Sequence, residues 1–82
     1  MRIKPLRDDL TLYLKKHNLT EKYNKSKMLF QQNPFYPSLH VELLEPKHRL
    51  IYSFRLDRKY RALFIYTDEQ EIEIIAFTNH YK

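Results

Sequence analysis

The sequence contains no glycine among its 82 residues. Glycine takes a positive φ more readily than any other residue, so turns that need this geometry must use another residue or be avoided. Asparagine and aspartate tolerate it best. Residues of these two types stand where the hydrophobic pattern requires turns: Asn18, Asn24, Asn33, Asp57 and Asp68. A glycine-rich phosphate-binding loop is excluded.

The length of the chain suits one hydrophobic core, and we expect a single domain over residues 1–82. There is no cysteine, so neither disulfides nor a thiolate metal site can stabilise the fold. No apolar run reaches the roughly 20 residues of a membrane span, and the first ten residues lack the apolar segment of a signal peptide. The sequence therefore predicts a soluble, cytoplasmic protein without a membrane partner.

The composition is basic and rich in tyrosine, with 15 Lys and Arg against 10 Asp and Glu, a net charge of +5 and 7 Tyr. Arginine pairs with phosphate, and flat aromatic rings stack on bases. This composition therefore suits nucleic acid or an acidic protein as a partner. The alternative is a basic surface that only prevents aggregation, since many small basic domains bind neither partner.

Two helices are expected before Pro34. The first covers residues 5–18, where apolar residues recur at spacings of three and four, namely Leu6, Leu10, Tyr13 and Leu14. Pro5 fits its first turn, and Asn18 fits its C-cap. The second helix begins at Thr20 and carries a weaker stripe of Tyr23, Lys27, Met28 and Phe30.

Four runs of β-branched, aromatic or alternating residues follow, separated by short polar breaks that suit hairpin turns. These runs are residues 38–45, 50–56, 60–67 and 71–77. Residues 1–4 are a candidate for a further short edge strand. The order of elements predicts an α+β fold, in which two N-terminal helices pack on a twisted, mainly antiparallel sheet of four to five strands.

The strands on either side of residues 57–59 each carry an arginine close to the turn. A hairpin there would bring Arg55 and Arg61 together, and two guanidinium groups repel unless an anion or a carboxylate lies between them. If the last strand pairs with residues 60–66, the chain ends near these arginines with His80 and Tyr81.

These side chains have the chemistry that RNA cleavage requires. Arginines bind a phosphate and stabilise charge that develops on it, histidine transfers protons near neutral pH, and tyrosine stacks on bases. The RNA 2′-hydroxyl supplies the nucleophile, so the reaction needs neither a metal nor a cofactor. The alternative is a solvated basic strand pair, followed by a histidine and a tyrosine that only end the chain.

From Pro34 onward the sequence resembles toxins of the RelE/ParE superfamily, and YoeB-like members in particular. The likeness rests on "YSFRL", on "YR" followed by apolar residues, on a polar break before the last strand, and on the terminal "HY". "NPFYPSLHVELLEP" also resembles the family's passage from helix to strand. The resemblance implies the toxin of a type II toxin–antitoxin system, a ribosome-dependent mRNA endoribonuclease that inhibits translation. Its partners would be the ribosome, mRNA and a cognate antitoxin, in a homodimer or a toxin–antitoxin heterocomplex.

The resemblance also assigns roles by position. Arg55 and Arg61 would bind the scissile phosphate and stabilise its transition state. His80 would act as the general acid or position the leaving group, and Tyr81 would stack on or orient the substrate base. Arg58 and Lys59 would reach flanking phosphates. A basic loop of Lys47, His48 and Arg49 would contact ribosomal RNA.

One position departs from the family pattern. YoeB-like members carry a glutamate, taken as the general base, near the start of the second strand, and the matching place here is Ser38. His40 and Glu42 are the candidates to replace it. Two alternative functions share the fold: a ParE-like inhibitor of DNA gyrase, and a non-enzymatic, decayed toxin that acts as an antitoxin-binding module.

Overall fold

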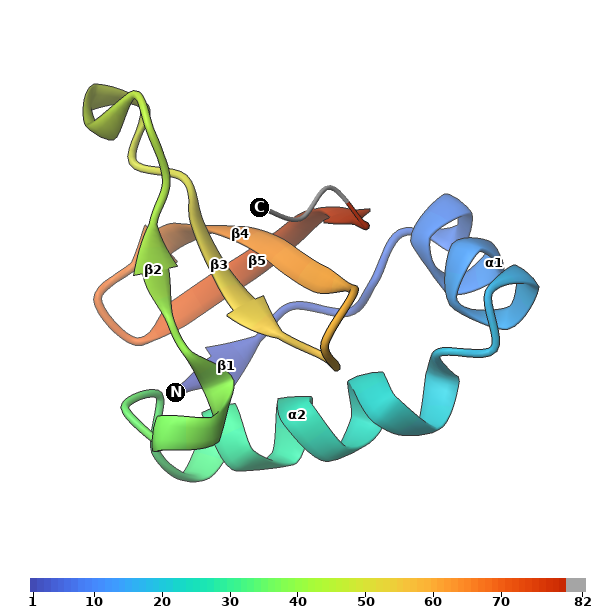
Figure 1. Ribbon diagram of the computed structural model, residues 1–82. Coiled ribbons are helices and arrows are strands. Elements are labelled where there is room, and N and C mark those ends of the chain that lie inside the picture. The colour runs from blue at the N-terminus through green and yellow to red at the C-terminus, as the bar shows by residue number, and fades with distance from the viewer. Residues whose placement is uncertain (80–82) are drawn as a thin grey trace.

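A computed structural model of the protein describes residues 1–79. Its elements follow the order β1 (Arg2–Ile3), α1 (Asp8–Lys16), α2 (Thr20–Gln32), η1 (Pro37–Leu39), β2 (Glu42–Leu43), η2 (Lys47–Arg49), β3 (Tyr52–Arg55), β4 (Arg61–Asp68) and β5 (Glu71–Thr78), where η marks a 3-10 turn (Figure 1). The sheet has 5 strands in the order β1-β5-β4-β3-β2. Only β1 and β5 run parallel, so the predicted α+β fold, its mainly antiparallel sheet and its N-terminal edge strand are confirmed.

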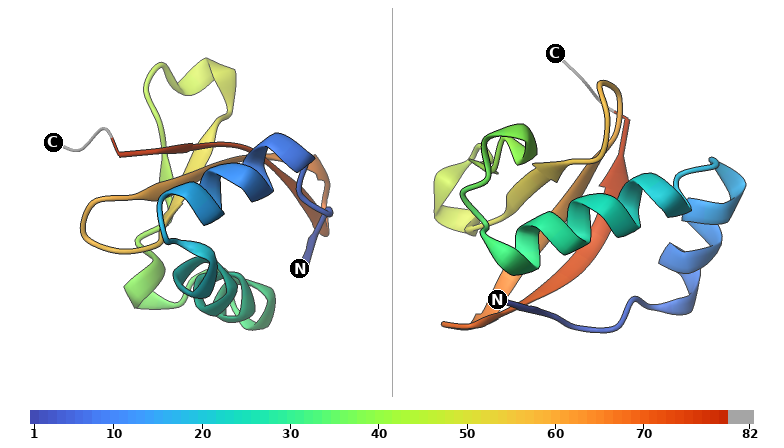
Figure 2. Two further views of the ribbon diagram at one scale, coloured as in Figure 1. Left: turned by 90° about the vertical axis from the view of Figure 1, so that its right-hand side faces the viewer. Right: turned by 90° about the horizontal axis from the view of Figure 1, so that it is seen from below.

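The hydrophobic core lies between the helices and one face of the sheet. Figure 2 shows α2 running along the sheet, while the segment around η2 projects on the other side. Phe30 of α2 stacks on Phe54 of β3 with ring centroids 5.2 Å apart, and it meets the edge of Phe64 of β4 at the same centroid distance. All three side chains are fully buried. Each such burial stabilises the fold by roughly 1.5–3 kcal/mol, so this aromatic cluster fixes α2 against β3 and β4.

Helix α1 is shorter at its start than the sequence predicts. It begins at Asp8, because Arg7 has an extended backbone and stands as the N-cap. The Arg7 guanidinium donates to both carboxylate oxygens of Asp9, at 3.0 and 3.1 Å, and to the Ile75 carbonyl at 3.2 Å. Pro5 therefore precedes the helix instead of lying in its first turn. No helix within residues 1–79 is long and apolar enough to cross a membrane.

The C-cap of α1 is His17, one residue before the predicted Asn18. Asn18 has φ 59°, and its N–H donates to the Lys15 carbonyl at 3.2 Å. The next N–H, that of Leu19, donates back to the Leu14 carbonyl at 2.8 Å. These two bonds form the Schellman motif that usually ends on glycine, so Asn18 replaces glycine here.

The other positive φ angles fall on residues that the sequence did not suggest. His40 has φ 44° and Leu50 has φ 55°, and each caps one of the two 3-10 turns. A left-handed conformation costs roughly 1–2 kcal/mol for a residue with a Cβ atom. At Asp57 and Asp68 the backbone has ordinary angles, and a carboxylate oxygen instead accepts backbone N–H groups within the turn. Asn24 and Asn33 also have negative φ.

Two further predictions were wrong in part. The run 38–45 was expected as one strand, but Pro37 starts the η1 turn and only Glu42–Leu43 pair with β3. On α2, Met28 was expected in the apolar stripe, but the residue is 54% exposed. Ser26 is buried instead, because its hydroxyl donates to the Arg55 carbonyl at 2.9 Å and joins the helix to β3.

Replacing Tyr23 by phenylalanine is expected to raise the free energy of unfolding by about 1 kcal/mol. The Tyr23 hydroxyl is buried and has no hydrogen-bond partner within residues 1–79, and burial raises the pKa of this phenol to about 12. The substitution removes the unsatisfied group and keeps the ring against Phe77. Urea unfolding of both proteins measures the difference. Equal or lower stability of the variant would mean that the hydroxyl is satisfied in solution.

Candidate active site

The central hairpin places the two arginines as predicted. Arg55 of β3 lies directly opposite Arg61 of β4, and opposite residues of an antiparallel pair point to the same face of the sheet. Ser53 shares that face because it lies two residues before Arg55. Glu42 of β2 lies directly opposite Ser53. The register thus gathers Glu42, Ser53, Arg55 and Arg61, which we call the register cluster, on the face away from the helices.

Arg61 is held in a defined orientation. Its Nε donates to the Ser53 hydroxyl at 2.8 Å, and one terminal nitrogen donates to the His40 carbonyl and, at 3.5 Å, to the Ser53 carbonyl. Ser53 is fully buried, so it is a rigid acceptor. The left-handed backbone of His40 turns its carbonyl toward the sheet. Arg61 is therefore positioned before any ligand arrives.

Arg55 is fixed by the turn that follows it. Its Nε donates to the Asp57 carbonyl at 3.1 Å. The Asp57 carboxylate accepts the backbone N–H groups of Lys59 and Tyr60 at 2.8 and 2.7 Å, and it pairs with Lys22 of α2 at 2.8 Å. Asp57 thus forms the β3–β4 turn without glycine and attaches it to α2.

Acid is expected to weaken this turn. Partial burial opposes ionisation of Asp57, but hydrogen bonds from Lys22 and from the Tyr60 and Lys59 amides outweigh it, so the pKa of Asp57 is lowered. A lowered pKa in the folded state contributes stability above the ordinary aspartate pKa of about 3.9, and this contribution is lost as pH falls through the folded value.

Chemical unfolding from pH 6 down to about pH 2 tests this contribution. The free energy of unfolding should fall more steeply for the wild type than for Asp57→Asn. Glu69→Gln, an exposed change in the β4–β5 turn, is the matched control and should keep the wild-type slope. Equal slopes for the wild type and Asp57→Asn would refute the assignment.

The last strand approaches the arginines as predicted. Thr78 of β5 lies directly opposite Arg61. His80 and Tyr81, the predicted acid and stacking residue, follow two and three positions later and lie outside the described residues. Their roles stay predictions.

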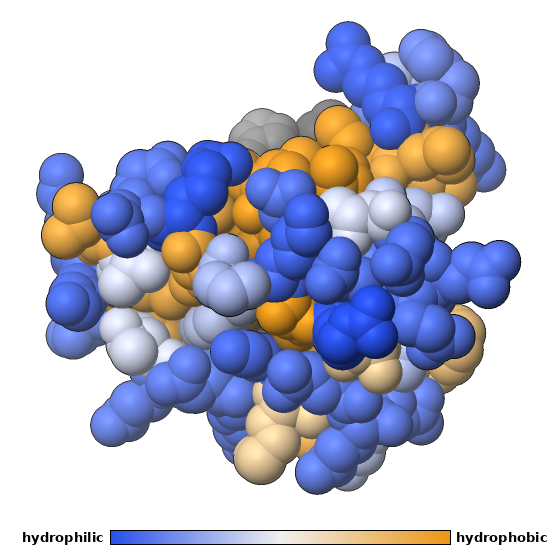
Figure 3. All heavy atoms as spheres, turned by 180° about the vertical axis from the view of Figure 1, so that it is seen from behind, coloured by the Kyte–Doolittle hydropathy of each residue, from blue (hydrophilic) through white to orange (hydrophobic). Residues whose placement is uncertain are grey.

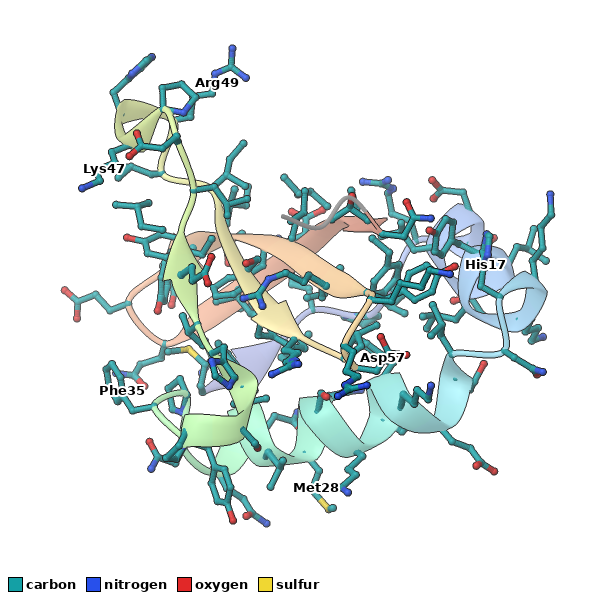
Figure 4. The ribbon with its side chains drawn as sticks, in the orientation of Figure 1. His17, Met28, Phe35, Lys47, Arg49 and Asp57 are labelled. Atoms are coloured by element: carbon teal, nitrogen blue, oxygen red, sulfur yellow. The ribbon has the colours of Figure 1, made fainter. Side chains whose placement is uncertain are left out.

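The predicted RNA-contacting residues fall into two separate groups. Lys47, His48 and Arg49 form η2, and Figure 4 shows Lys47 and Arg49 at the tip of a projecting segment, away from Asp57. Arg58 and Lys59 lie in the β3–β4 turn beside Asp57, next to α2. These are the two groups to which the resemblance gave different contacts, and the fold places the η2 tip away from the turn.

The two candidates for the general base, Glu42 and His40, lie in different parts of the structure. β2 begins at Glu42, whose exposed side chain belongs to the register cluster. His40 lies outside the strand and contacts Arg61 through its backbone carbonyl. Ser38, taken from the sequence as the family's glutamate position, lies in η1, before the strand begins. Within residues 1–79, no three His, Asp or Glu side chains come together as a metal site would require.

Sequence reasoning missed Ser53 as a partner of Arg61. The strand alternation already placed Ser53 on the face of Arg55, and a serine inside an otherwise bulky strand was the available signal. The hydrogen bond to Arg61, however, depends on the β3–β4 register.

No protein-family model and no curated protein matches the sequence. Solved structures do match. A YoeB/ParE toxin from Agrobacterium tumefaciens has a TM-score of 0.70 at 20% sequence identity, and the match covers 99% of this chain and 100% of that chain. A YoeB–YefM complex from Staphylococcus aureus has a TM-score of 0.68 at 20% identity, with 98% and 94% covered. A heterotetrameric YoeB–YefM toxin–antitoxin complex from the same species gives 0.66 at 20% identity, with 98% and 94% covered. The chain therefore has the fold of YoeB/ParE toxins, as the sequence resemblance predicted.

Proposed function

We propose that the protein is the toxin of a type II toxin–antitoxin system and cleaves mRNA on the ribosome. The observation that carries the proposal is the register cluster, in which Arg55 and Arg61 lie opposite each other with Glu42 on the same face. The fold of YoeB/ParE toxins supports the same class. Two arginines at opposite positions of one hairpin face supply N–H donors for a phosphate, since arginine binds phosphate oxygens through parallel N–H bonds.

The cluster supplies the parts of an internal transesterification. Glu42 accepts the proton of the RNA 2′-hydroxyl, and the 2′-oxygen then attacks the neighbouring phosphorus. Arg55 and Arg61 stabilise the negative charge that develops on the phosphoryl oxygens. The bond to the 5′-oxygen breaks, that oxygen takes up a proton, and the products are a 2′,3′-cyclic phosphate and a 5′-hydroxyl end. We assign the proton donation to His80 and the base contact to Tyr81.

An antitoxin is the expected protein partner, as in the YoeB–YefM complexes that share the fold. The helix-free face carries partly exposed apolar residues, Leu63, Ile65 and Ala76, beside the arginines. From behind, hydrophobic surface extends toward the hydrophilic projecting tip (Figure 3). Together with the net charge of +5, this face suits an acidic, amphipathic segment that covers the site. Such a toxin acts in the cytoplasm, where its ribosomal target is.

A ParE-like inhibitor of DNA gyrase is the second candidate, because one of the matching structures is named a YoeB/ParE toxin. Gyrase inhibition does not involve RNA cleavage, so it does not require Glu42 as a base or Arg61 as a phosphate ligand. A non-enzymatic antitoxin-binding module is the third candidate, and it predicts no toxicity.

Induced expression in a bacterial host, with mRNA 5′ ends mapped, separates these functions. We expect growth arrest with new 5′-hydroxyl ends inside translated codons, and the loss of both effects in Arg61→Ala and His80→Ala. Arrest without such ends but with gyrase-linked DNA breaks would replace the proposal by gyrase inhibition. A folded wild type that does not arrest growth would leave the binding module.

A further inference from the structure

A cleft of about 410 Å³ opens at the edge of β3, between α2, η1 and the β3–β4 turn. We call it the edge cleft. Its polar lining includes Lys25, Ser38, His40, Arg55, Asp57 and Arg58. It exists because β2 pairs only with Tyr52 and Ser53, which leaves the edge of β3 uncovered beside Phe54 and Arg55.

The edge cleft carries excess positive charge. Among its lining residues the one carboxylate, on Asp57, is already paired with Lys22 and accepts two backbone N–H groups. Lys25, Arg55 and Arg58 line the same cleft, and within residues 1–79 none of the three forms an ion pair. Like charges around one cavity repel each other, so a bound anion would stabilise the arrangement.

The edge cleft adjoins the register cluster. Arg55 belongs to both, and His40 lines the cleft while its carbonyl holds Arg61. An RNA strand whose scissile phosphate lies between Arg55 and Arg61 would therefore pass its neighbouring phosphate into the cleft. Phosphate contacts of this kind position a strand without reading its sequence.

We infer that the edge cleft is a second phosphate-binding subsite, in which Lys25 and Arg58 bind a backbone phosphate of the RNA next to the scissile one. The choice of RNA as the ligand rests on the proposed function. The prediction that the cleft binds phosphate rests on the lining of the cleft alone. Leu29 and Leu56 form the apolar part of the wall, and Ser38 adds a hydroxyl donor. Lys25 comes from a helix far before the hairpin arginines in the sequence, so no local motif indicated it.

The first test uses inorganic phosphate as the probe and needs no catalysis. Sodium phosphate is titrated at constant ionic strength, balanced with sodium chloride, while backbone amide resonances of the ¹⁵N-labelled protein are recorded. We expect saturable shifts at Ser38, Leu56 and Arg58. The variant K25Q/R58Q should weaken the affinity about tenfold, because neither glutamine can donate a charge-assisted hydrogen bond to the anion.

The matched control is K4Q/K16Q, which removes the same amount of charge outside the cleft. Lys4 follows β1, and Lys16 is the last residue of α1. It should bind phosphate like the wild type. Absence of saturable shifts, or equal weakening in the two double variants, would overturn the inference. Both substituted pairs are exposed, so a thermal melt should show native folding for each variant.

The second test identifies the anion. A fluorescein-labelled single-stranded oligoribonucleotide is titrated at several salt concentrations. The slope of log K against log salt should decrease in K25Q/R58Q by about 0.7 for each phosphate that the variant no longer neutralises. If instead this variant keeps the wild-type RNA affinity and slope but binds poly-glutamate more weakly, the cleft serves an acidic protein and the RNA assignment is wrong. Neither test depends on cleavage, so a failed nuclease assay leaves the phosphate result interpretable.

Discussion

Arg61→Lys is expected to lower mRNA cleavage about 100- to 1,000-fold, the usual cost of removing one positioned donor from a transition-state site. Lysine keeps the positive charge but has no planar fork of N–H groups. It cannot hold the Ser53 hydroxyl and the His40 carbonyl in the way that Arg61 does. The loss should therefore appear in the rate of cleavage on saturated ribosomes, measured by quantifying 5′ ends over time.

The control for this experiment is Arg2→Lys, which makes the same substitution in β1, the edge strand two strands away from β4. It should cleave like the wild type. Thermal unfolding of Arg61→Lys must be recorded as well, because Arg61 also joins β4 to the residue that follows η1. If a folded Arg61→Lys variant retained the wild-type cleavage rate, a positive charge at this position would be sufficient for cleavage. The proposed stabilisation of the transition state by the Arg61 guanidinium would then be wrong.

The sequence predicted the arginine pair because only local information was needed. Arg55 and Arg61 flank a short polar break, so any tight hairpin there places them opposite each other, and the register confirms it. The Schellman end of α1 at Asn18 was predictable for the same reason, since its hydrogen bonds join residues close in the chain.

Prediction from the sequence failed where distant segments decide the structure. His40 adopts a left-handed backbone although it is neither Asn nor Asp, and its carbonyl then meets an arginine 21 positions away. Lys25 reaches the edge cleft only because the Phe30 cluster fixes α2 against β3 and β4. Neither contact has a signal in the order of nearby residues.

The resemblance matched the family's glutamate position to Ser38, near the start of the expected strand. Ser38 lies in η1, and the strand itself begins only at Glu42. A 3-10 turn and the left-handed His40 take up the residues in between. The choice of Glu42 as the proposed base therefore comes from the β2–β3 register and not from the alignment of motifs.

Glu42→Gln is accordingly expected to lower the cleavage rate about 100- to 10,000-fold, the range for loss of a general base. The amide keeps the size of the side chain but cannot accept the 2′-hydroxyl proton. Because Glu42 is exposed, the substitution should leave thermal stability and ribosome binding nearly unchanged. Pre-steady-state cleavage of a ribosome-bound message measures the chemical step directly.

Two companion variants make this result decisive. Glu45→Gln removes an exposed carboxylate that follows β2 and should retain the wild-type rate. His40→Gly removes the imidazole but favours the left-handed backbone that presents the carbonyl to Arg61. It should keep the rate and unfold at a slightly higher temperature. If His40→Gly abolished the activity and Glu42→Gln kept it, the imidazole would be the base, and the carboxylate would only balance the charge of the arginines.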